Sequence, residues 1–135
     1  MSTQQILVER FLHSWSVGLE EFCVTVEKVF TDTTIWENVG YSTTTGAAEA
    51  VEHLRKSAGR LGWTRVDAAV LVIAPAGDQV VTERVDHHLD ADGQVLFSIR
   101  CASVFDLSED RITAIREYFD TAPLVAAGAA GCIGE

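Results

Sequence analysis

Basic residues are scarce in this sequence. Its 135 residues include 10 Lys and Arg against 20 Asp and Glu, which gives a formal net charge of −10. A nucleic-acid-binding surface requires clustered positive charge, and adsorption to anionic lipid requires a polybasic segment. The composition therefore argues against nucleic-acid and membrane partners.

Cysteines and long hydrophobic runs are also few. Cys23, Cys101 and Cys132 are odd in number and widely spaced, which fits neither a disulfide framework nor a CxxC metal site. We expect them to be buried free thiols. Apolar runs such as 68–75 are too short to span a bilayer. No charged-then-apolar signal opens the chain, so we expect a cytoplasmic location.

Several motifs that bind cofactors or supply nucleophiles are missing. The sequence has no GxSxG nucleophile elbow and no glycine-rich phosphate loop. His87 and His88 cannot chelate one ion together, because adjacent residues of a strand face opposite ways. His13 and His53 lack a ligand partner at helical spacing. We therefore expect neither a metal nor another cofactor.

The residue patterns that are present change character halfway along the chain. Helical periodicity predicts helices from Ser2 to about Gly18, over about 19–30 and over about 47–60, with a short extended segment at 34–39 and a loop at 40–46. Alternation then predicts strands over 63–73, 79–90, 94–107 and 111–119. Helices followed by sequential hairpins indicate an α+β fold, with three to four helices on one face of a strongly curved sheet. A sheet bent around its helices encloses a pocket, and 135 residues suit a single domain, 1–135.

The strand at 79–90 carries charged residues that need an explanation. Residues two apart share a face, so Arg84 and Asp86 lie on one side together with Thr82 and His88. Burying such a pair is costly unless it is well hydrogen-bonded. The alternative is an ion pair on a solvated face of the sheet. For His88 the face it shares with Asp86 allows a place at the cavity rim, but we expect it at an exposed edge.

A second carboxylate lies on the last strand. Glu117 shares its side with Ile115 and Phe119, which suggests that it points inward, although a solvated position is also possible. In the extended segment at 34–39, Asn38 and Trp36 share a face, and Asn38 could instead be a turn residue before Gly40. Two carboxyls bridged by a guanidinium can divide the work of general acid and general base. An apolar pocket around them would be lined by the following residues: Trp36, Ile115, Phe119, Phe97 and Ile99.

Three short segments resemble the limonene-1,2-epoxide hydrolase family. They are 36–38 (WEN), 82–86 (TERVD) and 116–120 (REYFD), and the resemblance extends over roughly 36–120. It implies an NTF2-like, cone-shaped fold of the SnoaL-like superfamily and a homodimer. It also implies an enzyme that opens a small apolar epoxide to a diol in one step, without metal or covalent intermediate.

The resemblance also implies roles for individual residues. Asp86 would be the acid that protonates the epoxide oxygen, and Glu117 the base that activates water. Asn38 would help to orient that water, and Arg84 would tie the two carboxyl groups together.

The sequence departs from the family pattern on the side of the water. Glu117 stands where the family typically has aspartate, and Trp36 where the limonene enzyme has a water-orienting tyrosine. An indole donates a hydrogen bond but cannot accept one. Relatives use a similar layout to direct an internal hydroxyl onto an epoxide, so an epoxide-opening cyclase of polyketide biosynthesis is one alternative. A non-catalytic small-molecule binder is another.

Overall fold

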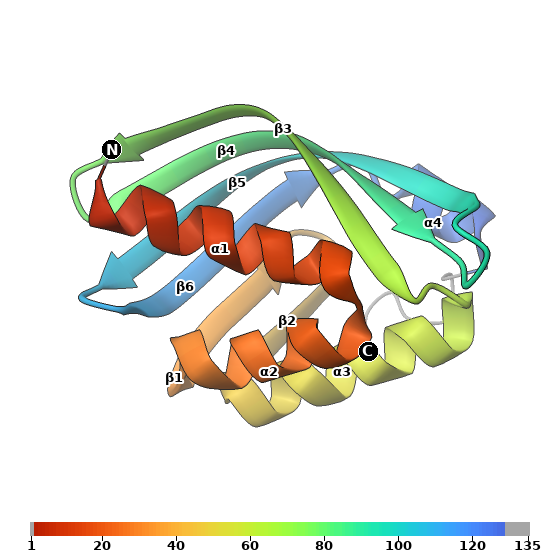
Figure 1. Cartoon of the computed structure of the whole chain (residues 1–135), viewed down its shortest axis with the longest axis horizontal. Coiled ribbons are helices and arrows are strands. Elements are labelled where there is room, and N and C mark those ends of the chain that lie inside the picture. The colour runs from red at the N-terminus through yellow and green to blue at the C-terminus, as the bar shows by residue number, and fades with distance from the viewer. Residues whose placement is uncertain (1, 129–135) are drawn as a thin grey trace.

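The computed structural model describes residues 2–128 (Figure 1). None of the helices in this part of the chain is long and apolar enough to cross a bilayer. The elements in chain order are α1 Thr3–Val17, α2 Leu19–Val29, β1 Phe30–Asn38, β2 Ser42–Thr45, α3 Gly46–Leu61, β3 Arg65–Ala76, β4 Gln79–Leu89, β5 Val95–Ser108, β6 Arg111–Phe119 and α4 Ala122–Ala126.

All six strands belong to one curved, mixed sheet, in the order β2-β1-β6-β5-β4-β3. Neighbouring strands are antiparallel except for β1 and β6, which run parallel. The long strands β3 to β6 arch over α1, and α2 and α3 lie on the open side of that arch (Figure 1). The predicted α+β architecture with a strongly curved sheet is confirmed.

The core fills the space between α1 and the concave face of the sheet. At its centre is the fully buried Phe11 of α1. Its ring contacts five other aromatic rings, with centroid distances between 5.5 and 6.4 Å: Trp15, Phe22, Phe30, Trp36 and Phe105. Because these rings come from helices and strands alike, this cluster fixes α1 and α2 against the sheet.

Local chemistry explains where the first and third helices begin. The hydroxyl of Ser2 accepts a hydrogen bond from the amide of Gln5 and so caps α1. Helix α3 begins at Gly46, which has φ +85° and packs directly on the backbone of Asp32 in β1. A Cβ at this position would lie 2.6 Å from the Asp32 carbonyl oxygen, so only glycine allows this close approach.

Two predictions about local structure were wrong. The segment predicted as a loop at 40–46 contains β2, which pairs antiparallel with β1. Its residues Ser42–Thr45 have no apolar alternation, so the strand depends on pairing with β1 and not on a buried face of its own. In addition, β1 begins at Phe30, where the second helix was still expected.

Candidate active site

The register of three strands brings the predicted charged residues together. Arg84 of β4 is opposite Cys101 of β5, and Thr82 of β4 is opposite Ser103, which is in turn opposite Glu117 of β6. Directly paired residues share a face of the sheet. Arg84 and Glu117 therefore lie in neighbouring rows on the concave face, although they are 33 positions apart in the chain.

Arg84 is the centre of this cluster and is fully buried. It donates from Nε to Asp86 Oδ1 and from Nη2 to Asp86 Oδ2, both at 3.0 Å. Its Nη1 donates to Thr82 Oγ1 at 2.8 Å and to Ser103 Oγ at 2.9 Å. Burial alone would lower the pKa of Arg84, but attraction to Glu117 and Asp86 raises it above its ordinary value. The guanidinium therefore stays charged.

Glu117 completes the cluster through a weaker contact. Its Oε1 lies 3.4 Å from Arg84 Nη2, within ion-pair distance, yet the geometry is not that of a hydrogen bond. Burial raises the pKa of Glu117 and the nearby Asp86 adds to this, while Arg84 and the indole N–H of Trp36 oppose it. The net effect is a carboxyl that holds its proton more tightly than an exposed glutamate does.

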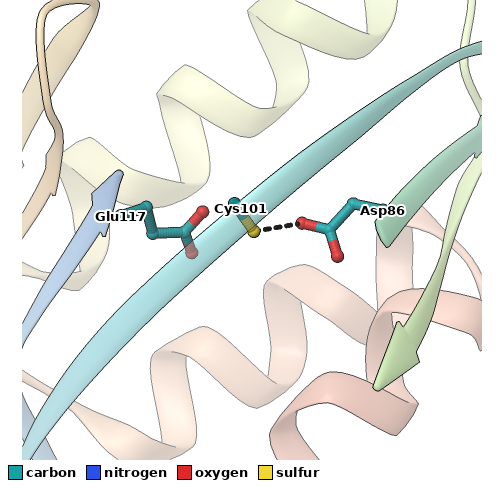
Figure 2. Close-up of side chains that lie close together, drawn as sticks. All are labelled: Asp86, Cys101 and Glu117. Atoms are coloured by element: carbon teal, nitrogen blue, oxygen red, sulfur yellow. Dashed lines mark hydrogen bonds between the residues drawn. The ribbon is translucent and has the colours of Figure 1, made fainter. Parts of the chain in front are cut away.

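The thiol of Cys101 lies between the two carboxyl groups, as Figure 2 shows. Burial raises the pKa of this thiol, with further contributions from Glu117 and Asp86, so it stays protonated. Its Sγ donates to Asp86 Oδ2 at 3.5 Å. The expectation that Cys23 and Cys101 are buried free thiols is confirmed, and Cys132 lies outside the described residues.

The same three side chains could in principle bind a metal ion. Donor atoms of Asp86, Cys101 and Glu117 lie within 4.8 Å of one another. However, Arg84 already donates to both oxygens of Asp86. A divalent ion would have to share the site with this positively charged guanidinium. The carboxyl groups therefore fit Arg84 as their cation better than a metal ion.

Asn38 lies beside Glu117, because β1 and β6 place these two residues opposite each other. Its side-chain amide donates to Ser42 Oγ at 3.3 Å, and its backbone carbonyl accepts from the amide of Tyr41. The short strand β2 therefore orients Asn38, through the same segment that the sequence predicted as a loop.

A cavity of about 100 Å³ opens onto the cluster. Of the sequence-predicted residues, Asp86, Glu117, Asn38, Trp36, Ile99 and Phe119 line it. Arg84 lies behind Asp86, with its guanidinium 5.1 Å from the ring centroid of Trp15. Ile115 and Phe97 were also expected in the lining, but they are not among its residues. Both are buried in the hydrophobic core.

The cavity also contains residues that the sequence did not single out. Tyr41, His53, Ser57 and Trp63 line it, as does His88, which was expected at an exposed edge. His88 shares the face of Asp86, so alternation on β4 already pointed toward the cavity. What the sequence could not show is that residues of α3 line the same cavity as this end of the strand.

Comparisons with known proteins show the family of this chain. A family model described as the limonene-1,2-epoxide hydrolase catalytic domain matches residues 3–129. The chain is also 34% identical over 113 residues to epoxide hydrolase EphG of Mycobacterium tuberculosis, a match that covers 84% of this chain and 70% of that protein.

Solved structures show the same fold. An LEH-like epoxide hydrolase of M. tuberculosis matches with a TM-score of 0.70 and 28% identity, over 93% of this chain and 90% of that one. A SnoaL-like polyketide cyclase from Shewanella denitrificans, described as putative, matches with a TM-score of 0.77 and 14% identity, over 94% and 97% of the two chains. The latter likeness shows the shared fold alone. Because the family match spans nearly the whole chain and includes every residue of the buried cluster, this chain belongs to the limonene-1,2-epoxide hydrolase family of epoxide hydrolases.

Proposed function

We propose that this protein adds water to a small, largely apolar epoxide to give a diol, with Asp86 as the acid and Glu117 as the base. The observation that carries the proposal is one buried guanidinium in contact with two carboxyls at the wall of a cavity. The family membership supports the reaction class, since both the matching family model and the relative EphG are described as epoxide hydrolases.

The charge count of the cluster explains how two carboxyls can play different roles. With Arg84 charged and both carboxyls ionised, the buried cluster would carry a net negative charge. A single proton makes it neutral, which an apolar site strongly favours. One carboxyl can then donate a proton while the other accepts one.

The proposed reaction needs no further group. The water oxygen attacks an epoxide carbon as the carbon–oxygen bond of the ring breaks. The proton of Asp86 passes to the released oxygen, and Glu117 takes a proton from the attacking water. Asn38, opposite Glu117 in the register, is in place to hold that water. The raised pKa of Glu117 makes its ionised form a stronger base.

The position of the proton changes over the cycle in this scheme. Burial raises the pKa of Glu117 and so favours its protonated form. That arrangement is the one left after turnover. The proton must therefore return from Glu117 to Asp86 before the next epoxide opens.

The cavity supports the choice of a compact substrate. Its volume is about 100 Å³, and most of its lining is aromatic or aliphatic, including Trp15, Phe22, Leu54, Val66 and Leu124. A long chain or a highly charged substrate would find few partners there.

The two roles can be separated with an anionic nucleophile. Asp86→Asn and Glu117→Gln should each lower kcat for epoxide hydrolysis by about 10²-fold or more, because each removes one proton-transfer group. Azide attacks without losing a proton, so it should restore ring opening in Glu117→Gln, with an azido alcohol as product, and not in Asp86→Asn. Product analysis by mass spectrometry checks this. Rescue of Asp86→Asn alone would show that the two roles are reversed.

The raised pKa of Glu117 also predicts a pH-dependent cost in stability. The folded state binds this proton more tightly than the unfolded chain, so the contribution of Glu117 is full below the unfolded pKa, near 4.5, and is lost as the pH rises through the folded pKa. Glutamine cannot ionise. Glu117→Gln should therefore be more stable than wild type by roughly 1 kcal/mol or more at about pH 8, with little gain at about pH 4.

Urea denaturation at both pH values measures this difference. Glu27→Gln, a change of an exposed glutamate on α2, is the matched control and should show no comparable pH dependence. A gain for Glu117→Gln that is equal at both pH values, or larger in acid, would contradict the assignment of the buried proton.

We also propose that the protein is a homodimer that pairs through the convex face of the sheet. Val72, Glu83, Ala102 and Tyr118 form one row across this face, from β3 to β6. Val72 and Tyr118 are each 50% exposed, and Val81, Val85 and Val104 on the same face are partly exposed. A second copy of this face would cover these apolar side chains.

Light scattering after size exclusion tests the dimer. Wild type should have twice the mass of the chain, and the double variant Val72→Lys/Tyr118→Lys should be monomeric, because it buries charge in the contact. A monomeric wild type would rule the dimer out. A matched pair of lysines on the exposed face of α3, Glu49→Lys/Glu52→Lys, should leave the mass unchanged.

A further inference from the structure

The end of the cavity away from Glu117 carries polar side chains that the acid–base scheme does not use. His53 and Ser57 come from α3, and His88 comes from β4. His88 lies two residues beyond Asp86 on the same face of the strand, which places it about 7 Å farther along. The rest of the wall at this end is apolar, as Trp63, Leu54 and Val66 show.

Two aromatic rings pack against His88. Its imidazole stacks on Phe97 with the centroids 4.3 Å apart, and Trp63 meets it edge-on at 5.8 Å. Its Nδ1 is buried and makes no hydrogen bond. A phenylalanine would fill the same space without leaving a buried polar atom unpaired, which is unfavourable. The ring also lines the cavity, where a neutral imidazole offers one donor and one acceptor nitrogen for hydrogen bonds with a ligand.

Ser57 is oriented toward the same region through Trp63. The indole Nε1 donates to Ser57 Oγ at 3.1 Å, so this hydroxyl serves as acceptor and its own hydrogen is left to donate. Trp63 thus contacts both His88 and Ser57, and it fixes the spacing between them.

The charge of this region limits what it can bind. Burial lowers the pKa of His88 to about 4, and burial together with Lys56 lowers the pKa of His53, so both rings are neutral near pH 7. Neutral imidazoles and a hydroxyl give no positive charge to hold a carboxylate. The cavity also contains Asp86 and Glu117, and the chain carries a net charge of −10. A group that fits this end is uncharged and able to hydrogen-bond.

We propose that His88, Ser57 and His53 form a second, uncharged polar subsite, and that the substrate is an epoxide bearing a hydroxyl or carbonyl oxygen about 7 Å from the epoxide oxygen. This inference rests on the proposed function in treating the ligand as a substrate. The subsite itself can be tested by binding alone. It makes His88 a specificity-determining residue, while Asp86 and Glu117 act on the epoxide.

A matched pair of epoxides tests the subsite. The epoxides of 4-(hydroxymethyl)cyclohexene and 4-ethylcyclohexene have nearly the same size, but only the first carries a remote hydroxyl. Their dissociation constants are measured by calorimetry in Glu117→Gln, and their kcat/KM values in wild type. The hydroxylated epoxide should be preferred by about five-fold or more in both measurements, which corresponds to one net hydrogen bond.

Three variants connect this preference to the named residues. His88→Phe, which preserves ring stacking, and Ser57→Ala should each reduce the preference for the hydroxylated epoxide. Thr44→Val, a change of similar size on β2 in the same cavity, is the control and should leave the preference intact. The epoxide of cyclohexene-4-carboxylate should bind more weakly than the ethyl compound.

The outcomes separate this inference from the proposed function. Equal affinities for the two uncharged epoxides, a preference that survives His88→Phe, or tighter binding of the carboxylate would overturn the subsite. A preference in binding without turnover of either epoxide by wild type would support the subsite and overturn the proposed function.

Discussion

The structure depends on a charge that has no access to water. Arg84 is fully buried in the concave face of the sheet, and its stability there requires every partner around it. Asp86 takes two of its hydrogen bonds, and Thr82 and Ser103 take two more. Removing one partner of such a buried pair typically costs about 3–5 kcal/mol, because the other charge is left uncompensated. The register of β4, β5 and β6 is therefore fixed by electrostatics as well as by apolar packing.

In the proposed function, the same charge lets two carboxyls work as an acid–base pair. The apolar wall excludes the solvent that would otherwise let both carboxyls ionise, and Arg84 supplies one positive charge for the two of them. The difference between them is geometric. Asp86 receives two hydrogen bonds from the guanidinium, whereas Glu117 has a single contact at 3.4 Å and keeps a raised pKa. One cation therefore contacts the two carboxyls unequally, and the two carboxyls lie in different environments.

Much of this arrangement can be predicted from sequence because it follows from alternation along strands. The shared face of Arg84 and Asp86, the inward side of Glu117 and the α+β architecture all come from period-two patterns. Three features do not, because they depend on contacts between distant segments. Strand β2 has no apolar face of its own, Cys101 meets Asp86 only through the β4–β5 register, and His88 lines one cavity together with residues of α3. The expected lining by Ile115 and Phe97 reflects the same limit, since inward residues can lie in the core or at the cavity, and periodicity does not distinguish the two.

The central claim is that the buried cluster holds a single proton shared between two carboxyls. Infrared difference spectroscopy of the ligand-free protein tests it directly, because a protonated carboxyl has a C=O stretching band distinct from the bands of a carboxylate. At neutral pH the wild type should show one such buried band, and the band should be absent from Glu117→Gln. A wild-type spectrum without a protonated carboxyl, with both Asp86 and Glu117 ionised beside Arg84, would contradict the account.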